Sequence, residues 1–126
     1  YVAQVLEQIC LVNLAFVGIG ALQPDSLMMR GERILTWQEV QPVLDRGAVG
    51  DIGLHFYDVH GNVLYSDIEE RLIGASAENY YQIDRVVGVA GGTDKFHSIL
   101  GGVRGRLVNT LITDLGTAQR MLAEGG

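Results

Sequence analysis

The chain has 126 residues, of which 48% are hydrophobic, and its mean hydropathy is +0.19. This composition is typical of one folded domain with its own core and argues against disorder. No apolar stretch approaches the roughly 20 residues needed to cross a bilayer, so we expect no membrane partner. Nine Lys and Arg against 15 Asp and Glu give a net charge of −6, and the basic residues are scattered. This distribution excludes the basic stripe of a nucleic-acid-binding surface.

The first residues predict a helix and bear on the origin of the chain. Residues 2–9 place apolar side chains at the i, i+3, i+4, i+7 spacing of an amphipathic helix. The only cysteine, Cys10, continues the apolar face, so we expect it in the core; it permits no internal disulfide, which fits a reducing cytoplasm. The chain starts at Tyr1, without a methionine or a signal peptide, and we expect a longer sequence before it.

The next segments predict strands and a capped helix. Residues 14–20 (LAFVGIG) have the pattern of a buried strand that ends in glycines. Thr36 and Glu39 have the spacing of a capping box, which predicts a short helix that ends near Arg46. Residues 52–58 and 62–67 flank a short turn, and they predict a β-hairpin.

The last third alternates between strands and helices. Ser76 can cap a short helix to Gln82, and after it the pattern predicts strands over 85–90 and 109–113 and helices over 93–104 and 115–124. Parallel strands need crossover connections, which are usually helical. We therefore predict an α/β fold with a largely parallel sheet, helices on both faces and a β-hairpin. Residues 1–126 show no internal repeat or linker, so we place them in a single unit.

Glycines at two strand ends predict a ligand-binding edge. Gly18 and Gly20 end one strand, and Gly91 and Gly92 of GVAGGTDK end another just before a helix. In open α/β sheets ligands bind beyond the carboxyl ends of the strands, where a helix N-terminus favours an anion. Lys95 would stand against the positive end of that helix, at a cost of roughly 0.3–1 kcal/mol that a bound anion would remove. Tight turns without a ligand and a solvated surface lysine are the alternative interpretations.

Other motifs of nucleotide binding and catalysis are missing. The loop is not a P-loop, because its spacing differs and Phe96 stands after Lys95 where that motif has Ser or Thr, and it does not have the G-x-G-x-x-G spacing either. The sequence has no nucleophile elbow and no Ser, His and Asp set that stands out, so we expect no catalytic residue. The three histidines, at positions 55, 60 and 97, share no metal-ligand spacing, and we expect no metal and no cofactor.

For four charged residues the sequence alone does not decide between a structural role and a role in ligand binding. Asp114 lies between a strand and a helix and should cap the helix. Asp51 begins a strand among small residues, so it lies either at a sheet edge or in a cleft. Arg30 and Arg33 could pair with a phosphate or simply cover surface.

Three segments carry a family resemblance: 16–22 (FVGIGAL), 47–62 (GAVGDIGLHFYDVHGN) and, above all, 85–123, which begins RVVGVAGGTDKFHS. With these segments the chain resembles the effector-binding domain of the SorC-type sugar-operon regulators. The resemblance implies a domain similar to ribose-5-phosphate isomerase and CoA transferases, with a Rossmann-type fold, that binds a phosphorylated sugar. Proteins of this family are usually tetramers and bind operator DNA through a separate N-terminal helix-turn-helix, which this chain lacks.

The resemblance also implies roles for single residues. Lys95 matches the lysine that contacts the sugar phosphate, and Asp51 matches an acidic position that holds sugar hydroxyls. Arg30 or Arg33 lies near an arginine that faces the ligand. Three residues of the loop would supply backbone groups to the same site: Gly91, Gly92 and Thr93. A typical sensor domain of this family is about twice as long, so we expect the chain to be its C-terminal half, with another phosphate-binding loop in the missing half.

Departures from the family affect local geometry. Gly101 and Gly102 lie in a helix where the family commonly has alanine or leucine, at a cost of up to roughly 1 kcal/mol each, and His55 stands where an arginine is frequent. We predict that the chain is a sugar-phosphate sensor domain and not an enzyme. The alternative is an isomerase-like enzyme in which Asp51 is the general base and Lys95 the electrophile.

Overall fold

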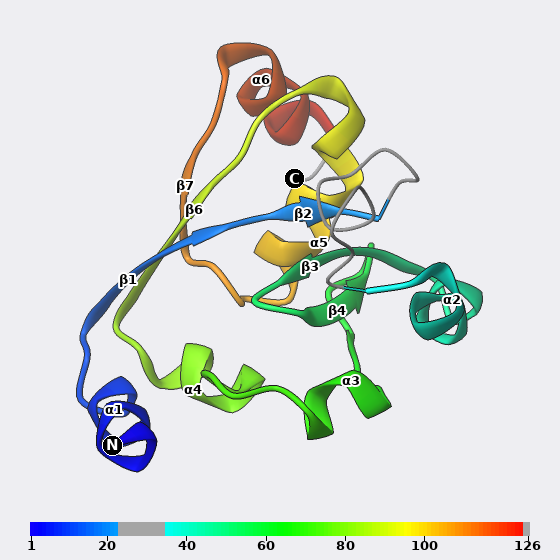
Figure 1. The fold of residues 1–126 in the computed structure, drawn as a ribbon. Helices are drawn as coiled ribbons and strands as arrows, with labels where there is room; N and C mark the ends of the chain where they lie inside the picture. The colour runs from blue at the N-terminus through cyan, green and yellow to red at the C-terminus, as the bar shows by residue number, and fades with distance from the viewer. Residues whose placement is uncertain (23–34, 125–126) are drawn as a thin grey trace.

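The computed structural model describes residues 1–22 and 35–124. Helices and strands alternate along the chain, and strands from both ends meet in the middle of the molecule (Figure 1). The α-helices are α1 (Val2–Ile9), α2 (Trp37–Asp45), α3 (Asp67–Glu70), α4 (Ala77–Gln82), α5 (Phe96–Arg104) and α6 (Leu115–Glu124). The strands are β1 (Leu14–Gly18), β2 (Gly20–Ala21), β3 (Ala48–Ile52), β4 (His55–Asp58), β5 (Val63–Leu64), β6 (Arg85–Val89) and β7 (Thr110–Ile112). A 3₁₀ turn, η2 (Thr93–Lys95), precedes α5.

A three-stranded parallel sheet, in the order β1-β6-β7, brings the two ends of the chain together. Leu14 pairs with Arg85 and Gly18 with Val89, so the carboxyl ends of β1 and β6 lie side by side. One predicted glycine pair, Gly18 and Gly20, lies where β1 passes into β2, and the other, Gly91 and Gly92, lies in the loop after β6. The α/β class is therefore confirmed, and the sheet sets both glycine-rich segments at one edge.

An antiparallel sheet, in the order β2-β3-β4-β5, is larger than the predicted hairpin. The prediction of one strand over 52–58 was wrong, because a tight turn at Gly53 and Leu54 divides the segment into β3 and β4. Both turn residues have positive φ, which matches the right-handed twist of a hairpin but is rare for leucine. The predicted strand over 14–20 is likewise divided, since β1 joins the parallel sheet and β2 the antiparallel one.

The helix starts follow from local capping. Thr36 accepts a hydrogen bond from the Glu39 amide at 3.2 Å, and Glu39 accepts one from the Thr36 amide at 3.1 Å, which confirms the predicted capping box of α2. Ser76 and Asn79 form the same arrangement at the start of α4. These side chains satisfy amides that a first helical turn leaves without partners.

Helix α5 joins the two sheets through the main core. Buried residues from both sheets pack with Ile99 of α5, among them Ile52, Tyr57 and Val86. The Tyr57 hydroxyl donates to the Ser98 carbonyl at 2.7 Å. The two helical glycines face this contact, because a Cβ on Gly101 would lie 2.5 Å from the Asp58 carbonyl oxygen. Close packing of the helix on the hairpin therefore explains a glycine that the sequence left unexplained.

We predict that Gly101→Ala destabilises the domain even though alanine favours helices by about 1 kcal/mol. Its methyl group would overlap backbone that cannot easily move, and overpacking of this kind costs about 1–3 kcal/mol. Chemical denaturation measures the difference. The matched control is Gly74→Ala, whose Cβ would meet nothing within 4 Å and which should change stability by less than about 0.5 kcal/mol. Equal stability of the two variants would contradict the tight helix contact.

The parallel sheet is covered on one face in the described residues. Val17 and Val86 pack against the core under α5. On the other face Phe16 and Val89 are exposed, and Val87, which pairs with Phe16, is buried.

Helix α1 has no fully buried residue, although Leu6 and Ile9 of its apolar stripe are half-buried. The prediction that Cys10 lies in the core was wrong, because Cys10 ends this exposed helix and is itself exposed.

Candidate functional site

The site of interest lies where β1 passes into β2, beside the loop that leads from β6 into α5 (Figure 1). Lys95 ends the 3₁₀ turn and is the residue before α5. Its side chain is half-buried and reaches across the edge of the sheet, where its Nζ donates to the Ile19 carbonyl at 3.3 Å. This position favours a role inside the fold over the alternative of a solvated surface lysine.

Asp51 approaches the same backbone from the antiparallel sheet. It lies in β3, opposite Gly20 of β2, and its exposed fraction is 6%. Because β3 lies between β2 and β4, the alternative of an edge position is excluded. Its Oδ2 accepts from the Leu54 amide at 3.2 Å, and its Oδ1 is buried without a hydrogen-bond partner.

Gly20 makes room for the carboxylate of Asp51. A Cβ on Gly20 would lie 2.3 Å from Asp51 Oδ1, so no larger residue fits while the carboxylate keeps this position. The Gly20 carbonyl accepts from the Ser98 hydroxyl at 2.8 Å, which ties β2 to α5. The sequence did not single out Ser98; its one signal is that it lies one helical turn after Lys95 and so shares its face of the helix.

Burial dominates the electrostatics of the carboxylate. It raises the pKa of Asp51 to about 6, although the Leu54 amide and the charges of His55 and Lys95 act in the opposite direction. Among the described residues, Asp51 and Lys95 form no direct ion pair. An acceptor oxygen and an ammonium group therefore flank the Ile19–Gly20 backbone without neutralising each other.

The glycine loop before Lys95 is held by Asp114. The Gly92 amide donates to Asp114 Oδ2 at 2.9 Å, and the amide and hydroxyl of Thr117 donate to the same carboxylate, each at 2.8 Å. These bonds lower the pKa of Asp114 to about 2. The prediction that Asp114 caps a helix is confirmed, and the same carboxylate fixes the loop that positions Lys95.

The remaining predicted site residues lie in different places. Gly91, Gly92 and Thr93 are exposed in the loop beside Lys95. Gly18 is exposed at the end of β1, where a Cβ would meet nothing within 4 Å. Arg30 and Arg33 lie outside the described residues.

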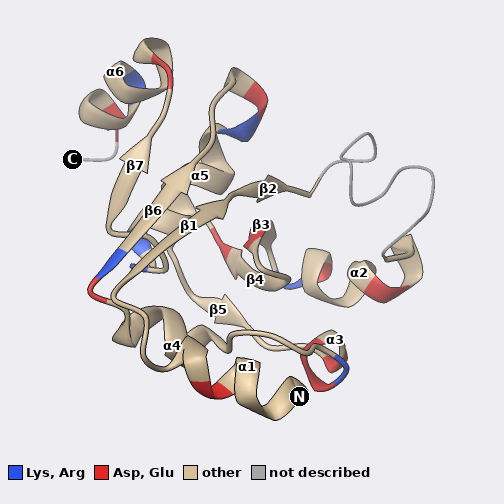
Figure 2. Ribbon diagram, turned by 60° about the vertical axis from the view of Figure 1, so that its left-hand side comes forward, with Lys and Arg blue, Asp and Glu red and all other residues tan. Residues whose placement is uncertain are grey.

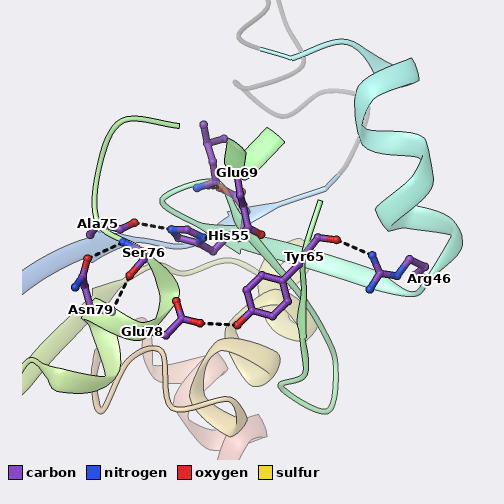
Figure 3. A network of polar contacts seen from close by, with 10 residues as sticks. Arg46, His55, Tyr65, Glu69, Ala75, Ser76, Glu78 and Asn79 are labelled. Atoms are coloured by element: carbon purple, nitrogen blue, oxygen red, sulfur yellow. Dashed lines mark hydrogen bonds and ion pairs between the residues drawn. The ribbon is translucent and has the colours of Figure 1, made fainter. Parts of the chain in front are cut away.

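His55 belongs to a neighbouring polar network (Figure 3). It is buried in β4, and its Nε2 lies 2.6 Å from the Ala75 carbonyl, to which it donates. Its Nδ1 faces Glu69 Oε2 at 3.7 Å. Through these contacts His55 links the segment between α3 and α4 to β4, the strand after the turn at Gly53 and Leu54. His60 and His97 are exposed.

The described residues gather neither metal ligands nor basic side chains in one place. No group of three His, Cys, Asp or Glu side chains is placed to hold a metal, and Lys and Arg are spread over several elements (Figure 2).

A groove of about 600 Å³ lies at the opposite end of the parallel strands, with Tyr80, Arg106 and Thr110 in its lining. Because none of the predicted ligand residues lines it, we assign the site by contacts and not by cavity size. None of the helices within residues 1–22 and 35–124 could span a lipid bilayer.

Comparison with known proteins identifies the domain. Residues 1–123 match the family model described as "Putative sugar-binding domain". The uncharacterized transcriptional regulator YjhU of Escherichia coli (strain K12) is 38% identical over 110 residues, which are 86% of this chain and 33% of that protein. The chain therefore spans about a third of the length of this curated relative.

Two solved structures share the fold over almost the whole chain. A domain from Vibrio fischeri described as "Putative Sugar-Binding Domain of Transcriptional Repressor" matches with a TM-score of 0.82 at 31% identity, and the match covers 96% of this chain and 48% of the Vibrio fischeri chain. The full-length sorbitol operon regulator SorC from Klebsiella pneumoniae matches with a TM-score of 0.80 at 26% identity, and the match covers 96% of this chain and 38% of the SorC chain. The chain belongs to the sugar-binding domain family of SorC-type transcriptional regulators, as its sequence resemblance implied.

Proposed function

We propose that this domain senses a phosphorylated sugar, with Lys95 at the phosphate and Asp51 at the hydroxyl groups. The observation that carries the proposal is the buried, unpartnered Oδ1 of Asp51 beside the backbone that Lys95 contacts. A buried acceptor without a donor costs about 1–3 kcal/mol, and a sugar hydroxyl would remove that cost. The ammonium group of Lys95 supplies a charge-assisted bond to an anion.

Other predicted residues would complete the site. The loop residues Gly91, Gly92 and Thr93 lie next to Lys95 and would approach the ligand with their backbone. Gly18 and Gly20 have no side chains and would leave space for the ligand on the β1–β2 side of the site. Arg30 would add a second cation. Asp114 already takes the Gly92 amide, so we assign this aspartate the role of holding the loop in position.

In the whole protein this domain would act as the switch of a regulator. The ligand would bind one of two conformations more tightly and so change the affinity of the oligomer for operator DNA. A separate helix-turn-helix domain would make the DNA contact, and we propose a cytoplasmic homo-oligomer, a tetramer as in the family. This chain would be the C-terminal half of the sensor domain, which fits its 48% coverage of the Vibrio fischeri domain.

Thermal shift assays with paired ligands test the proposal. Ribose 5-phosphate, glucose 6-phosphate and fructose 6-phosphate would each be compared with the free sugar. At 100 times the dissociation constant a ligand adds about 2.7 kcal/mol of stability. We expect saturable stabilisation by at least one phosphate ester and none by its parent sugar. A flat response to the whole panel, extended to bisphosphates, would contradict the proposal.

The isomerase alternative retains one supporting observation. A buried carboxyl with a pKa of about 6 would suit a general base near neutral pH. NMR observation of aldose phosphate turning into ketose phosphate with purified protein would favour this alternative. Binding without turnover favours the sensor.

A further inference from the structure

Arg120 of α6 lies against the first residue of α5. Its guanidinium carbon is 3.8 Å from the centre of the Phe96 ring, and Phe96 is buried, with an exposed fraction of 1%. A cation at this distance is attracted by the face of an aromatic ring. The Arg120 Nε also donates to Glu124 Oε2 at 3.1 Å, one helical turn further on, which restricts the orientation of the guanidinium. Helix α6 therefore has a specific contact with the residue that follows Lys95.

The same helix holds the other end of the glycine loop (Figure 1). Asp114, the residue before α6, accepts from the Gly92 amide at 2.9 Å and from the amide of Thr117 in the first turn at 2.8 Å. The loop is thus tied to α6 at Gly92 and at Phe96, and Lys95 lies between the two contacts. A shift of the Lys95 backbone would disturb one contact or the other.

The side chain of Lys95 contributes little to its own placement. Within the described residues its ammonium group donates one hydrogen bond, of 3.3 Å, to the Ile19 carbonyl. The charge is carried on a flexible stem of four carbons, which samples many positions unless its base is fixed. The position of the ammonium group therefore depends on how firmly the neighbouring residues hold the backbone.

Arg120 and Lys95 approach the loop from different sides. In the parallel sheet β1 and β7 lie on opposite sides of β6. Lys95 reaches the Ile19 carbonyl just after β1, whereas Arg120 belongs to the helix after β7. We infer that Arg120 is a positioning residue for Lys95, which acts through the Phe96 ring and keeps the ammonium group at the edge where the ligand would bind. The expected effect on ligand affinity rests on the proposed function, but the placement of Lys95 does not.

The reactivity of Lys95, the only lysine of the chain, reports its placement without a ligand. Mass spectrometry compares its acetylation with that of the α-amino group. In Arg120→Ala this ratio should rise about two- to fivefold, the factor that corresponds to an exposed cation–π contact. Arg120→Lys keeps a cation over the ring and should stay within about twofold of the wild type. The matched control Arg106→Ala removes the same charge at the far end of the strands and should leave the ratio unchanged.

Ligand affinity provides a second measurement. Arg120→Ala should bind the stabilising sugar phosphate about two- to fivefold more weakly in isothermal titration calorimetry, and Arg120→Lys should restore the affinity. In a Phe96→Leu background Arg120→Ala should cause no further loss, because the ring through which it acts is gone. If no sugar phosphate binds the wild type, the proposed function fails, while the acetylation ratios still test this inference.

Three results would overturn the inference. An unchanged Lys95 reactivity in Arg120→Ala, even with a lower melting temperature, would show that the contact serves stability alone. An equal change in Arg106→Ala would assign the effect to net charge. A full loss of affinity on adding Arg120→Ala to Phe96→Leu would exclude a route through the ring. Arg120 is exposed, so the single variants should fold and decide the question even if Phe96→Leu does not fold.

Discussion

Lys95→Ala should weaken the binding of the stabilising sugar phosphate by about 10- to 100-fold. The substitution removes charge-assisted hydrogen bonds to the phosphate, which contribute about 1.5–3 kcal/mol in a half-buried position. Isothermal titration calorimetry, or the ligand dependence of the melting temperature, measures the loss. In the absence of ligand the variant should stay folded, because the side chain makes one long bond to the Ile19 carbonyl.

Arg106→Ala is the matched control for this prediction. It removes the same unit of charge from an exposed position at the far end of the strands. If both variants lose affinity equally, the effect is a general one of net charge and the assignment of Lys95 fails. An unchanged affinity in Lys95→Ala would contradict the assignment directly.

The chain offers a second route to the same test, because Lys95 is its only lysine. Acetylation of primary amines would modify Lys95 and the α-amino group alone. Bound sugar phosphate should protect Lys95 from the reagent while the α-amino group reacts at an unchanged rate. Mass spectrometry of the two peptides separates the two reactions.

Local signals in the sequence predicted the helices well. Thr36 with Glu39 and Ser76 ahead of α4 act within one turn of chain, so their spacing alone predicts the caps that the structure contains. Asp114 was predicted as a cap for the same reason, but its bond to the Gly92 amide joins segments far apart in sequence. Spacing along the chain carries no sign of such a contact.

The strand errors have a physical cause. Residues 14–20 are continuously apolar and residues 52–58 are mostly apolar, and hydrophobicity does not show where a strand leaves one sheet or reverses. The reversal at Gly53 and Leu54 needs positive φ at a leucine, which no turn preference would predict. Cys10 was misplaced because an apolar helical stripe was assumed to be fully covered, and no residue of α1 is fully buried in the described residues.

The sequence predicted some of the residues that form the candidate site. Asp51 and Lys95 were identified mainly through family resemblance, and the structure brings both to the Ile19–Gly20 backbone. Ser98 had no signal of its own, because its role is to hold the Gly20 carbonyl across the fold. The raised pKa of Asp51 follows from burial, which depends on how the two sheets pack and not on its neighbours in sequence.

Asp51→Asn should stabilise the free domain and weaken its ligand binding at the same time. Burial raises the pKa of Asp51 from 3.8 to about 6, and one unit corresponds to about 1.4 kcal/mol. At pH 7 the buried charge therefore costs up to about 3 kcal/mol. The uncharged amide avoids this cost, so we expect a gain of about 1–3 kcal/mol at pH 7 in chemical denaturation.

The pH dependence of stability has a definite sign. Between pH 4 and 6 the folded chain binds more protons at Asp51 than the unfolded chain, so its stability falls as the pH rises through this window. Asp51→Asn should remove that slope. Asp114 has a lowered pKa and contributes in the opposite direction at lower pH, where Asp114→Asn serves as the control. A slope between pH 4 and 6 that survives Asp51→Asn would assign it to another group.

Ligand binding should favour the charged form of Asp51 over the neutral form. Sugar hydroxyls donate to the carboxylate and stabilise its charged form, so binding lowers the pKa of Asp51 and releases a proton below about pH 6. Affinity should therefore fall more steeply below that value in the wild type than in Asp51→Asn, by up to about tenfold per pH unit. In the variant only the phosphate of the ligand, whose second pKa is about 6, still titrates in this range. Because Asn replaces an acceptor by a donor at the position of Oδ1, its affinity should be at least about tenfold weaker at pH 7. A free domain made more stable by the change that weakens its binding would show that the buried charge is retained for the ligand and not for the fold.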